Sequence, residues 1–157
     1  MQKIVTFLWF NDNAEEALNF YTNVFPDSRV KNVSRYGPAG PGTPGSVMSA
    51  TIELAGQEFM LLNGGPHFSF TPAISLFVRC RDQAEVDSYW TQLLAGGEES
   101  QCGWLKDRFG LSWQIIPDAL GRLLSDRDPG RATRAMQAML RMKKIDVAEL
   151  ERAANAA

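Results

Sequence analysis

The chain repeats one order of predicted elements, and this internal repeat limits the fold more than any other feature of the sequence. Each half begins with an apolar, β-rich segment, continues with an amphipathic helix and ends with a run of shorter strands. The predicted strands cover 3–10, 28–36, 46–55 and 57–63 in the first half, and 73–80, 98–101, 103–108 and 111–116 in the second. The sequence therefore predicts two β-α-β-β-β modules.

The repeat can be followed residue by residue in two places. Asn13-Ala14-Glu15-Glu16-Ala17 aligns with Asp82-Gln83-Ala84-Glu85-Val86, an offset of 69 from 13 to 82. Gly56-Gln57-Glu58-Phe59 aligns with Gly110-Leu111-Ser112-Trp113, an offset of 54 from 56 to 110. The shorter offset means that the second half lacks the Gly/Pro segment 37–45, which we expect to be a mobile lid or hairpin loop.

Helix signals occur at the start of both repeats and again after Pro117. Asn11-Asp12-Asn13 supplies capping side chains for a first helix that ends before Pro26. Near the C-terminus, Asp128-Pro129 predicts one helix start, and Asp146 with Glu149 predicts a capping box for a helix over 146–155. The basic residues of this region are interpreted as a solvated helix face, because no aromatic side chains alternate with them to stack on nucleic-acid bases.

These elements predict an α+β fold in which two βαβββ modules form a curled mixed sheet with a cleft, followed by C-terminal helices. We assign the domain to 1–120, its modules to about 1–66 and 73–117, and a helical extension to 121–157. A length of 157 residues is enough for one well-packed domain.

The composition limits which partners and which compartment we expect for the chain. The net charge of −2 gives no electrostatic case for nucleic acid or an anionic membrane, and no apolar run is long enough to cross a bilayer. The N-terminal segment lacks a small-residue cleavage site, so we expect a cytoplasmic protein. We expect the two cysteines, Cys80 and Cys102, to be free thiols, because nothing indicates export.

Several segments resemble one family. They are Asn13-Ala14-Glu15-Glu16-Ala17 with Phe20-Tyr21 and Phe25-Pro26-Asp27-Ser28, Leu62-Asn63-Gly64-Gly65-Pro66-His67-Phe68, Ile74-Ser75-Leu76-Phe77-Val78, the stretch from Cys102 to Gln114, and that from Met139 to Asp146. Together they resemble the PhnB-like, or 3-demethylubiquinone-9 3-methyltransferase-like, branch of the vicinal oxygen chelate superfamily, which includes glyoxalases, bleomycin-resistance proteins and dioxygenases. The resemblance implies the two-module fold and a homodimer.

The resemblance also implies where a metal would be held in relatives with known chemistry. The positions lie on the first and last strand of each module and fall on Thr6, Met60, Ser75 and Gln114. Two hydroxyls, a thioether and an amide lack the charge and strong donor nitrogen that catalytic dications need. We therefore expect no metal and no cofactor.

What remains is a predicted small-molecule cleft with apolar walls and a few neutral polar groups. Strand alternation places Leu8 and Phe10 with Thr6, and Phe77 with Ser75, while Trp9 and Trp113 would face the helices. The predicted ligand-binding residues are Thr6, Leu8, Phe10, Met60, Asn63, Ser75, Phe77 and Gln114.

Three functions stay open at this stage. The first is a metal-independent protein that binds and sequesters a hydrophobic or aromatic compound. The second is a metal-independent enzyme that uses His67 or Cys102 on a small organic substrate, although a loop histidine and a buried, inert thiol are the commoner roles. The third is a dimeric interaction subunit with a Met-bearing C-terminal helix. The methyltransferase label gains no support, because the Gly-rich segment 37–45 lies between two strands.

Overall fold

A computed structural model describes residues 1–156, which divide into two compact units. Unit 1 covers Met1–Phe70, and unit 2 begins at Thr71. Each unit is described below by itself.

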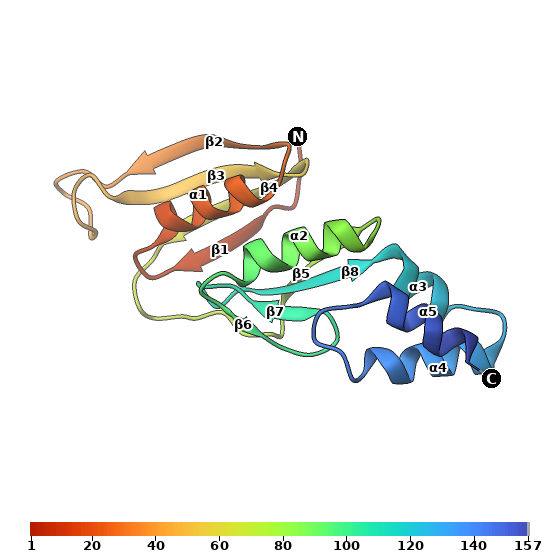
Figure 1. Ribbon diagram of the computed structural model, residues 1–157. Coiled ribbons are helices and arrows are strands. Elements are labelled where there is room, and N and C mark those ends of the chain that lie inside the picture. Colours follow the sequence, from red (N-terminus) through yellow and green to blue (C-terminus); the bar gives the residue numbers. More distant parts are fainter. Residues whose placement is uncertain (157) are drawn as a thin grey trace. The chain divides into compact units, whose positions relative to one another are not determined.

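Unit 1 is one βαβββ module (Figure 1). Its four strands lie in the order β1-β4-β3-β2, with β1 parallel to β4 and the other neighbours antiparallel. Positive φ angles at Ala55 and Gly56 close the tight turn from β3 to β4 that the sequence predicts. The elements are β1 (Thr6–Phe10), α1 (Ala14–Val24), β2 (Ser28–Arg35), β3 (Val47–Leu54) and β4 (Gln57–Asn63).

Unit 2 repeats this topology in the strand order β5-β8-β7-β6, with β5 parallel to β8. The predicted pair of βαβββ modules is therefore confirmed. The elements are β5 (Ser75–Cys80), α2 (Gln83–Leu94), β6 (Glu98–Glu99), β7 (Trp104–Lys106) and β8 (Ser112–Pro117).

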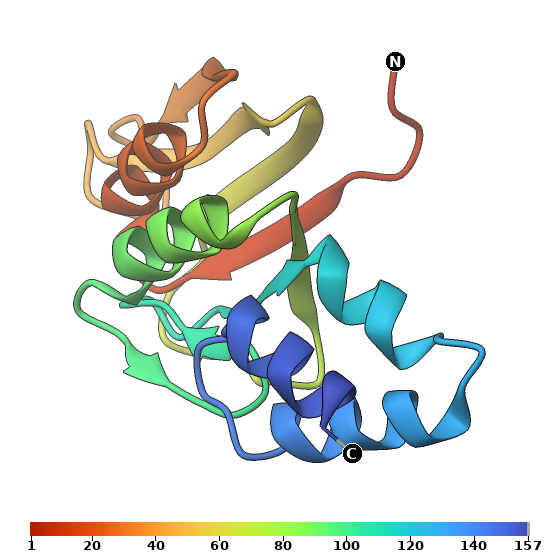
Figure 2. The ribbon, with the colours of Figure 1, turned by 45° about the vertical axis from the view of Figure 1, so that its right-hand side comes forward.

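Three helices complete unit 2 and lie side by side next to the end of β8 (Figures 1 and 2). They are α3 (Asp118–Leu124), α4 (Pro129–Met139) and α5 (Val147–Asn155). The sequence predicts α4 and α5 at their capping residues, and the structure adds α3, which starts directly after β8. Their shared hydrophobic cluster consists of Ile116, Leu120, Leu123, Ala135, Ala138, Ile145, Leu150 and Ala154.

The strand register corrects the predicted alignment of the two first strands. Phe7 pairs with Met60 in unit 1, and Phe77 pairs with Gln114 in unit 2. Since 60 and 114 differ by 54, Phe7 corresponds to Phe77, and the offset in these strands is 70 rather than 69. The reason is a turn that is one residue longer before α1 than before α2. A slip of one residue moves every side chain of a strand to the other face.

The buried face of the unit 1 sheet is the face that α1 covers. Asn63 shows this directly, because its Oδ1 accepts a hydrogen bond of 2.8 Å from the first helical N–H, that of Ala14. The Asn63 Nδ2 donates to Val47 O at 2.9 Å. Asn63 thereby supplies the side-chain cap that the sequence assigns to residues 11–13; Asn13 itself makes no side-chain cap bond.

The Gly/Pro segment 37–45 is the hairpin loop between β2 and β3, as one of the two predicted alternatives states. The loop folds around Tyr36, whose ring would lie 2.8 Å from a Cβ at Gly40 and 2.3 Å from one at Gly42. The Tyr36 hydroxyl donates to Asn63 O at 2.8 Å. The two glycines therefore give the aromatic ring the space that side chains would fill.

Candidate functional site

A row of three side chains crosses the face of the unit 2 sheet that is turned away from α2. We call the sheet face turned away from α1 or α2 the helix-free face of its unit. Gln114, on the central strand β8, pairs with Phe77 on β5 and with Trp104 on β7. Paired residues of neighbouring strands point to the same face, so an amide lies between two aromatic rings. The Phe77 side chain is 53% exposed, and Gln114 and Trp104 are half-buried. A flat molecule that lies on this face can contact all three side chains of the row.

Hydroxyl groups accompany the amide of Gln114. Its Nε2 donates to Ser75 Oγ at 2.9 Å, a bond between two neighbours on the same face. Ser112 lies opposite Ser75, is buried, and its hydroxyl has no hydrogen-bond partner within residues 1–156. Because a primary amide has two N–H groups and a carbonyl oxygen, Gln114 can bond to Ser75 and to a ligand at the same time. The set is neutral and can both donate and accept.

The other face of the unit 2 sheet is structural. Trp113 is buried there, as predicted, and its Nε1 donates to Asp107 Oδ2 at 2.9 Å. Asp107 Oδ1 also accepts from the backbone N–H groups of Phe109 and Leu111 and so fixes the turn between β7 and β8. These bonds satisfy a buried carboxylate and leave Asp107 no part in ligand binding.

The corresponding row of unit 1 is less polar. Phe7 pairs with Met60, and Met60 pairs with Thr51 on β3. The Phe7 side chain is 51% exposed. Trp9 lies on this same helix-free face, two residues after Phe7, and the prediction that Trp9 faces the helix is wrong.

A loop after β4 holds Trp9 in place. The Trp9 indole Nε1 donates to Gly65 O at 3.0 Å, and Phe68 packs edge-on against the ring at 5.0 Å between centroids. Gly64 has no room for a side chain, since a Cβ there would lie 2.4 Å from the indole. Trp9 is therefore a fixed part of the unit 1 surface.

The register separates the predicted ligand-binding residues into two groups. Ser75, Phe77, Gln114 and Met60 lie on helix-free faces, whereas Thr6, Leu8, Phe10 and Asn63 lie on the face that α1 covers. The expectation that Thr6 and Met60 share one face is therefore wrong. The buried Asn63 amide bonds both to α1 and to β3, which assigns it a structural role. The sequence did not show that Phe7 lies beside Met60 and Trp104 beside Gln114, because only the pairing of the strands brings these residues together.

The two catalytic candidates, His67 and Cys102, have different surroundings. His67 is exposed in the loop after β4 in unit 1. Cys102 is partly exposed rather than buried as predicted, and its φ of +57° is in the left-handed region. Cys80 is the buried thiol, and burial, together with the nearby carboxylates of Glu85, Asp118 and Asp82, raises its pKa to about 12. Both cysteines are free, as expected.

The residues present do not fit a catalytic divalent metal. In the observed register, the equivalent positions of the two units are Phe7 with Phe77 and Met60 with Gln114. This set contains no imidazole, thiolate or carboxylate, and the set that the sequence predicted contains none either. Within residues 1–156, no three His, Cys, Asp or Glu side chains are grouped so that they could hold a metal ion.

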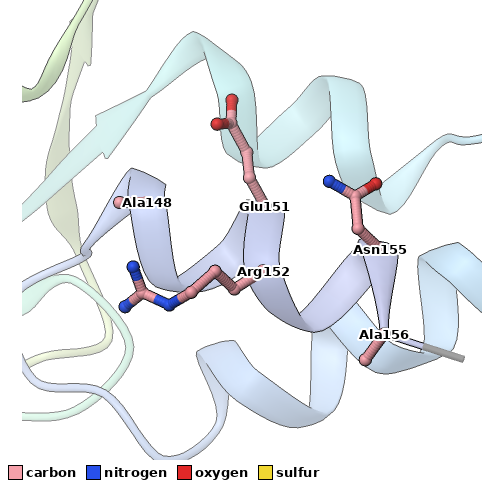
Figure 3. A pocket seen from close by; sticks show the side chains of 5 residues that line it. All are labelled: Ala148, Glu151, Arg152, Asn155 and Ala156. Carbon is pink, nitrogen blue, oxygen red and sulfur yellow. The ribbon is translucent and has the colours of Figure 1, made fainter.

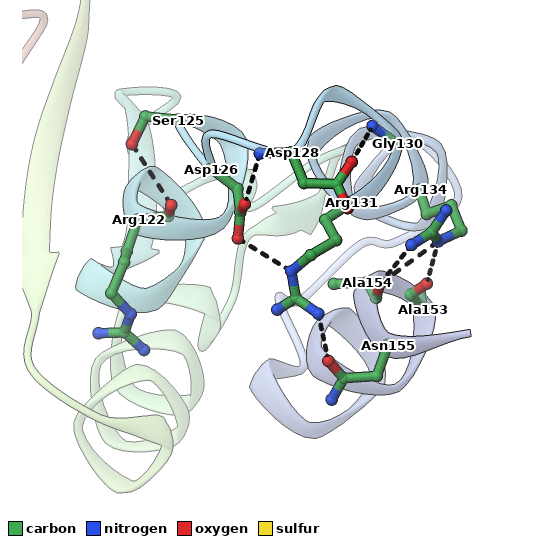
Figure 4. Close-up of polar contacts among 10 residues, drawn as sticks. All are labelled: Arg122, Ser125, Asp126, Asp128, Gly130, Arg131, Arg134, Ala153, Ala154 and Asn155. Atoms are coloured by element: carbon green, nitrogen blue, oxygen red, sulfur yellow. Dashed lines mark hydrogen bonds and ion pairs between the residues drawn. The ribbon is translucent and has the colours of Figure 1, made fainter. Parts of the chain in front are cut away.

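A hollow of about 600 Å³ lies on α5 and is lined by Ala148, Glu151, Arg152, Asn155 and Ala156 (Figure 3). These residues are one exposed side of a single helix, and Arg152 pairs with Glu149. Asn155 belongs to a bracing network in which Arg131 also contacts Asp126, while Arg134 donates to the carbonyls of Ala153 and Ala154 (Figure 4). We interpret these bonds as stabilising the packing of the C-terminal helices, not as part of a binding site.

Comparisons with known proteins agree with the fold. The model of a family described as 3-demethylubiquinone-9 3-methyltransferase matches residues 2–116. The solved structure of a PhnB protein from Bacillus cereus is 42% identical, with a TM-score of 0.70, and the match covers 74% of this chain and 99% of that one. No curated protein matches. Residues after 116 lie outside the family match.

More distant structures share the fold alone. A protein from Pseudomonas aeruginosa is 20% identical, with a TM-score of 0.62, over 74% of this chain and 98% of that one. The fosfomycin resistance protein FosX from Listeria monocytogenes, solved with Mn(II) and sulfate, is 15% identical, with a TM-score of 0.53, over 72% of this chain and 89% of that one. Within residues 1–156, no helix is long and apolar enough to span a membrane.

Proposed function

The chain belongs to the 3-demethylubiquinone-9 3-methyltransferase-like, or PhnB-like, family of the vicinal oxygen chelate superfamily, and from that premise we propose that it binds a small organic molecule without a metal. The binding surface is the helix-free face of unit 2. The ligand is flat, uncharged and largely apolar, with one polar edge, as in a phenol.

The observation that carries this proposal is the row Phe77–Gln114–Trp104. Aromatic rings offer stacking and apolar area to a flat ligand, with geometric preferences that orient it. The amide between them recognises a polar edge, and Ser75 fixes the amide through the 2.9 Å bond. A few fixed polar groups among apolar ones are the usual composition of a small-molecule site.

Methyl transfer is not part of the proposal. A methyl donor that carries adenosine usually binds at a glycine-rich turn between a strand and a helix. The turns before α1 and α2 are Asn11-Asp12-Asn13 and Arg81-Asp82, and neither contains glycine. Turnover by His67 or Cys102 has no supporting contact in the structure. A homodimer in the cytoplasm stays a prediction.

The test is a pair of reciprocal substitutions. Binding of 4-methylphenol is measured by calorimetry for Gln114→Met and for Met60→Gln, after chelator treatment of every sample. We expect Gln114→Met to weaken binding roughly fivefold, the value of one ordinary hydrogen bond, and Met60→Gln to leave it unchanged. Binding that depends on an added divalent metal, or equal effects of both substitutions, would contradict the proposal.

A further inference from the structure

The β8 residues on the helix-free face of unit 2 change from polar to apolar along the strand, and Arg79 on β5 pairs with Ile116 at the apolar end. Ser112, Gln114 and Ile116 follow each other at every second position, so all three point to this face. The hydroxyls of Ser75 and Ser112 lie on one side of Gln114, and Ile116 lies on the other. An amphiphilic ligand held at Gln114 would therefore direct its polar edge toward the serines and its apolar end toward Ile116.

Ile116 is also where the C-terminal helices meet this face. Its side chain is only 9% exposed and belongs to the hydrophobic cluster of α3, α4 and α5. Ile145, which is fully buried, packs in the same cluster. A Cβ at Gly103 would lie 2.7 Å from Ile116 Cδ1 and 3.0 Å from Ile145 Cγ1. The missing side chain at Gly103 thus lets both isoleucines reach this place.

The segment 142–147 between α4 and α5, which we call the strap, is fixed by its backbone to the turn between β6 and β7. The N–H of Cys102 donates to Met142 O at 2.8 Å, and that of Gly103 donates to Lys143 O at 2.7 Å. The two bonds therefore hold the strap beside the turn that precedes Trp104.

Side chains of α2 hold the other end of the strap. The Gln83 amide donates to Ile145 O at 2.9 Å and accepts from the N–H of Val147 at 2.7 Å. Lys144 Nζ lies 2.8 Å from Asp87 Oδ1. The position of Ile145 is consequently set by bonds on both sides of it.

We propose that Ile116, supported from behind by the C-terminal helices, forms the end wall of the binding face and limits the length of the ligand. Ile145 is a positioning residue that holds Ile116 in this place. The proposal rests on the small-molecule function proposed above. It concerns the contact between Ile116, the last residue of the family match, and the C-terminal helices that follow.

The experiment measures binding of a series of 4-alkylphenols, from methyl to hexyl, to the full chain. For the wild type we expect affinity to fall once the alkyl chain reaches the wall. Ile116→Ala should shift this limit toward longer chains, with a gain of roughly fourfold for each additional methylene that becomes buried. Ile145→Ala should shift the limit in the same direction by a smaller amount.

Ile116→Val and Ile145→Val are the matched controls, because each removes little volume and should keep the fold. Hydrogen exchange at the Cys102 and Gly103 amides reports in each variant whether the strap is still bound. A length limit that is the same in the wild type and both alanine variants would overturn the wall and leave the small-molecule function intact. A wild type that binds no alkylphenol would overturn both proposals.

Discussion

The two units share one register and differ in what their helix-free faces offer a ligand. In unit 1 the central row is Phe7–Met60–Thr51, and in unit 2 it is Phe77–Gln114–Trp104. The first position is a phenylalanine in both rows, with closely similar exposure. The difference lies in the other two, where unit 2 has an amide and an indole.

This difference shows that two repeated modules can keep the same kind of core while their helix-free faces carry different side chains. The helix-covered faces stay apolar in both units, with Leu61 and Ile115 fully buried at equivalent positions. On the helix-free faces only unit 2 combines a hydrogen-bonded amide with an aromatic side chain on each side. We therefore propose unit 2 as the unit that binds the ligand.

The largest expected effect concerns the carboxylate that supports the unit 2 face from behind. Asp107→Ala leaves the N–H groups of Phe109, Leu111 and Trp113 without their acceptor in a buried turn. We expect a loss of about 3 kcal/mol or more in the free energy of unfolding, measured by urea denaturation. Asp12→Ala, at an exposed position of unit 1, is the control. A loss below about 1 kcal/mol would mean that this turn does not depend on Asp107.

Asn63→Ala is the corresponding test for unit 1. The substitution removes an acceptor from Ala14 N and a donor from Val47 O, both buried. We expect a loss of about 2 kcal/mol, with faster hydrogen exchange at the start of α1. Asn32→Ala, at an exposed position of β2, should change stability little. Unchanged binding of 4-methylphenol by Asn63→Ala would agree with a structural role, and a selective loss of binding would restore Asn63 as a ligand residue.

Phe77→Ala and Phe7→Ala compare the two faces directly. Both side chains are about equally exposed, so neither substitution should disturb the core. We expect Phe77→Ala to weaken binding of 4-methylphenol roughly tenfold through lost stacking and contact area, about 1.4 kcal/mol. Phe7→Ala should have no effect. The reverse result, measured in the same titration, would move the site to unit 1.

The smallest effect is a pH dependence of unit 2 that Asp87 contributes. Hydrogen bonds from Lys144 and then Gln83 lower the pKa of Asp87 below its usual value near 3.8. Its contribution is therefore complete above that value and is lost as the pH falls through the lowered pKa. Because the pair is exposed, we expect Asp87→Asn to cost less than about 1 kcal/mol at pH 7. The difference from the wild type should shrink below pH 4, and a constant difference would contradict this origin.

Much of the fold could be predicted from the sequence, because the helices and strands have strong local signals. Apolar spacing and capping residues identify α1, α2, α4 and α5. The glycine at position 56 identifies the turn between β3 and β4. Helix α3 was missed, since it follows β8 directly without a capping signal of its own.

The site was predicted only in part, because it depends on strand pairing. Helix capping residues align at an offset of 69, and carrying that offset into β1 selects Thr6 instead of Phe7. One additional residue in a turn was enough to reverse the faces of β1. Ser75, Phe77 and Gln114 were placed together correctly, since alternation within β5 and β8 needs no alignment between the halves.

The most direct test of the central claim is a ¹⁵N NMR titration of the chelator-treated protein with 4-methylphenol. We predict that the indole N–H of Trp104 and the side-chain amide of Gln114 shift with the same affinity, while the indole N–H of Trp9 stays unchanged. Shifts confined to Trp9 and its neighbours in unit 1, or shifts that appear only after a divalent metal is added, would contradict the claim.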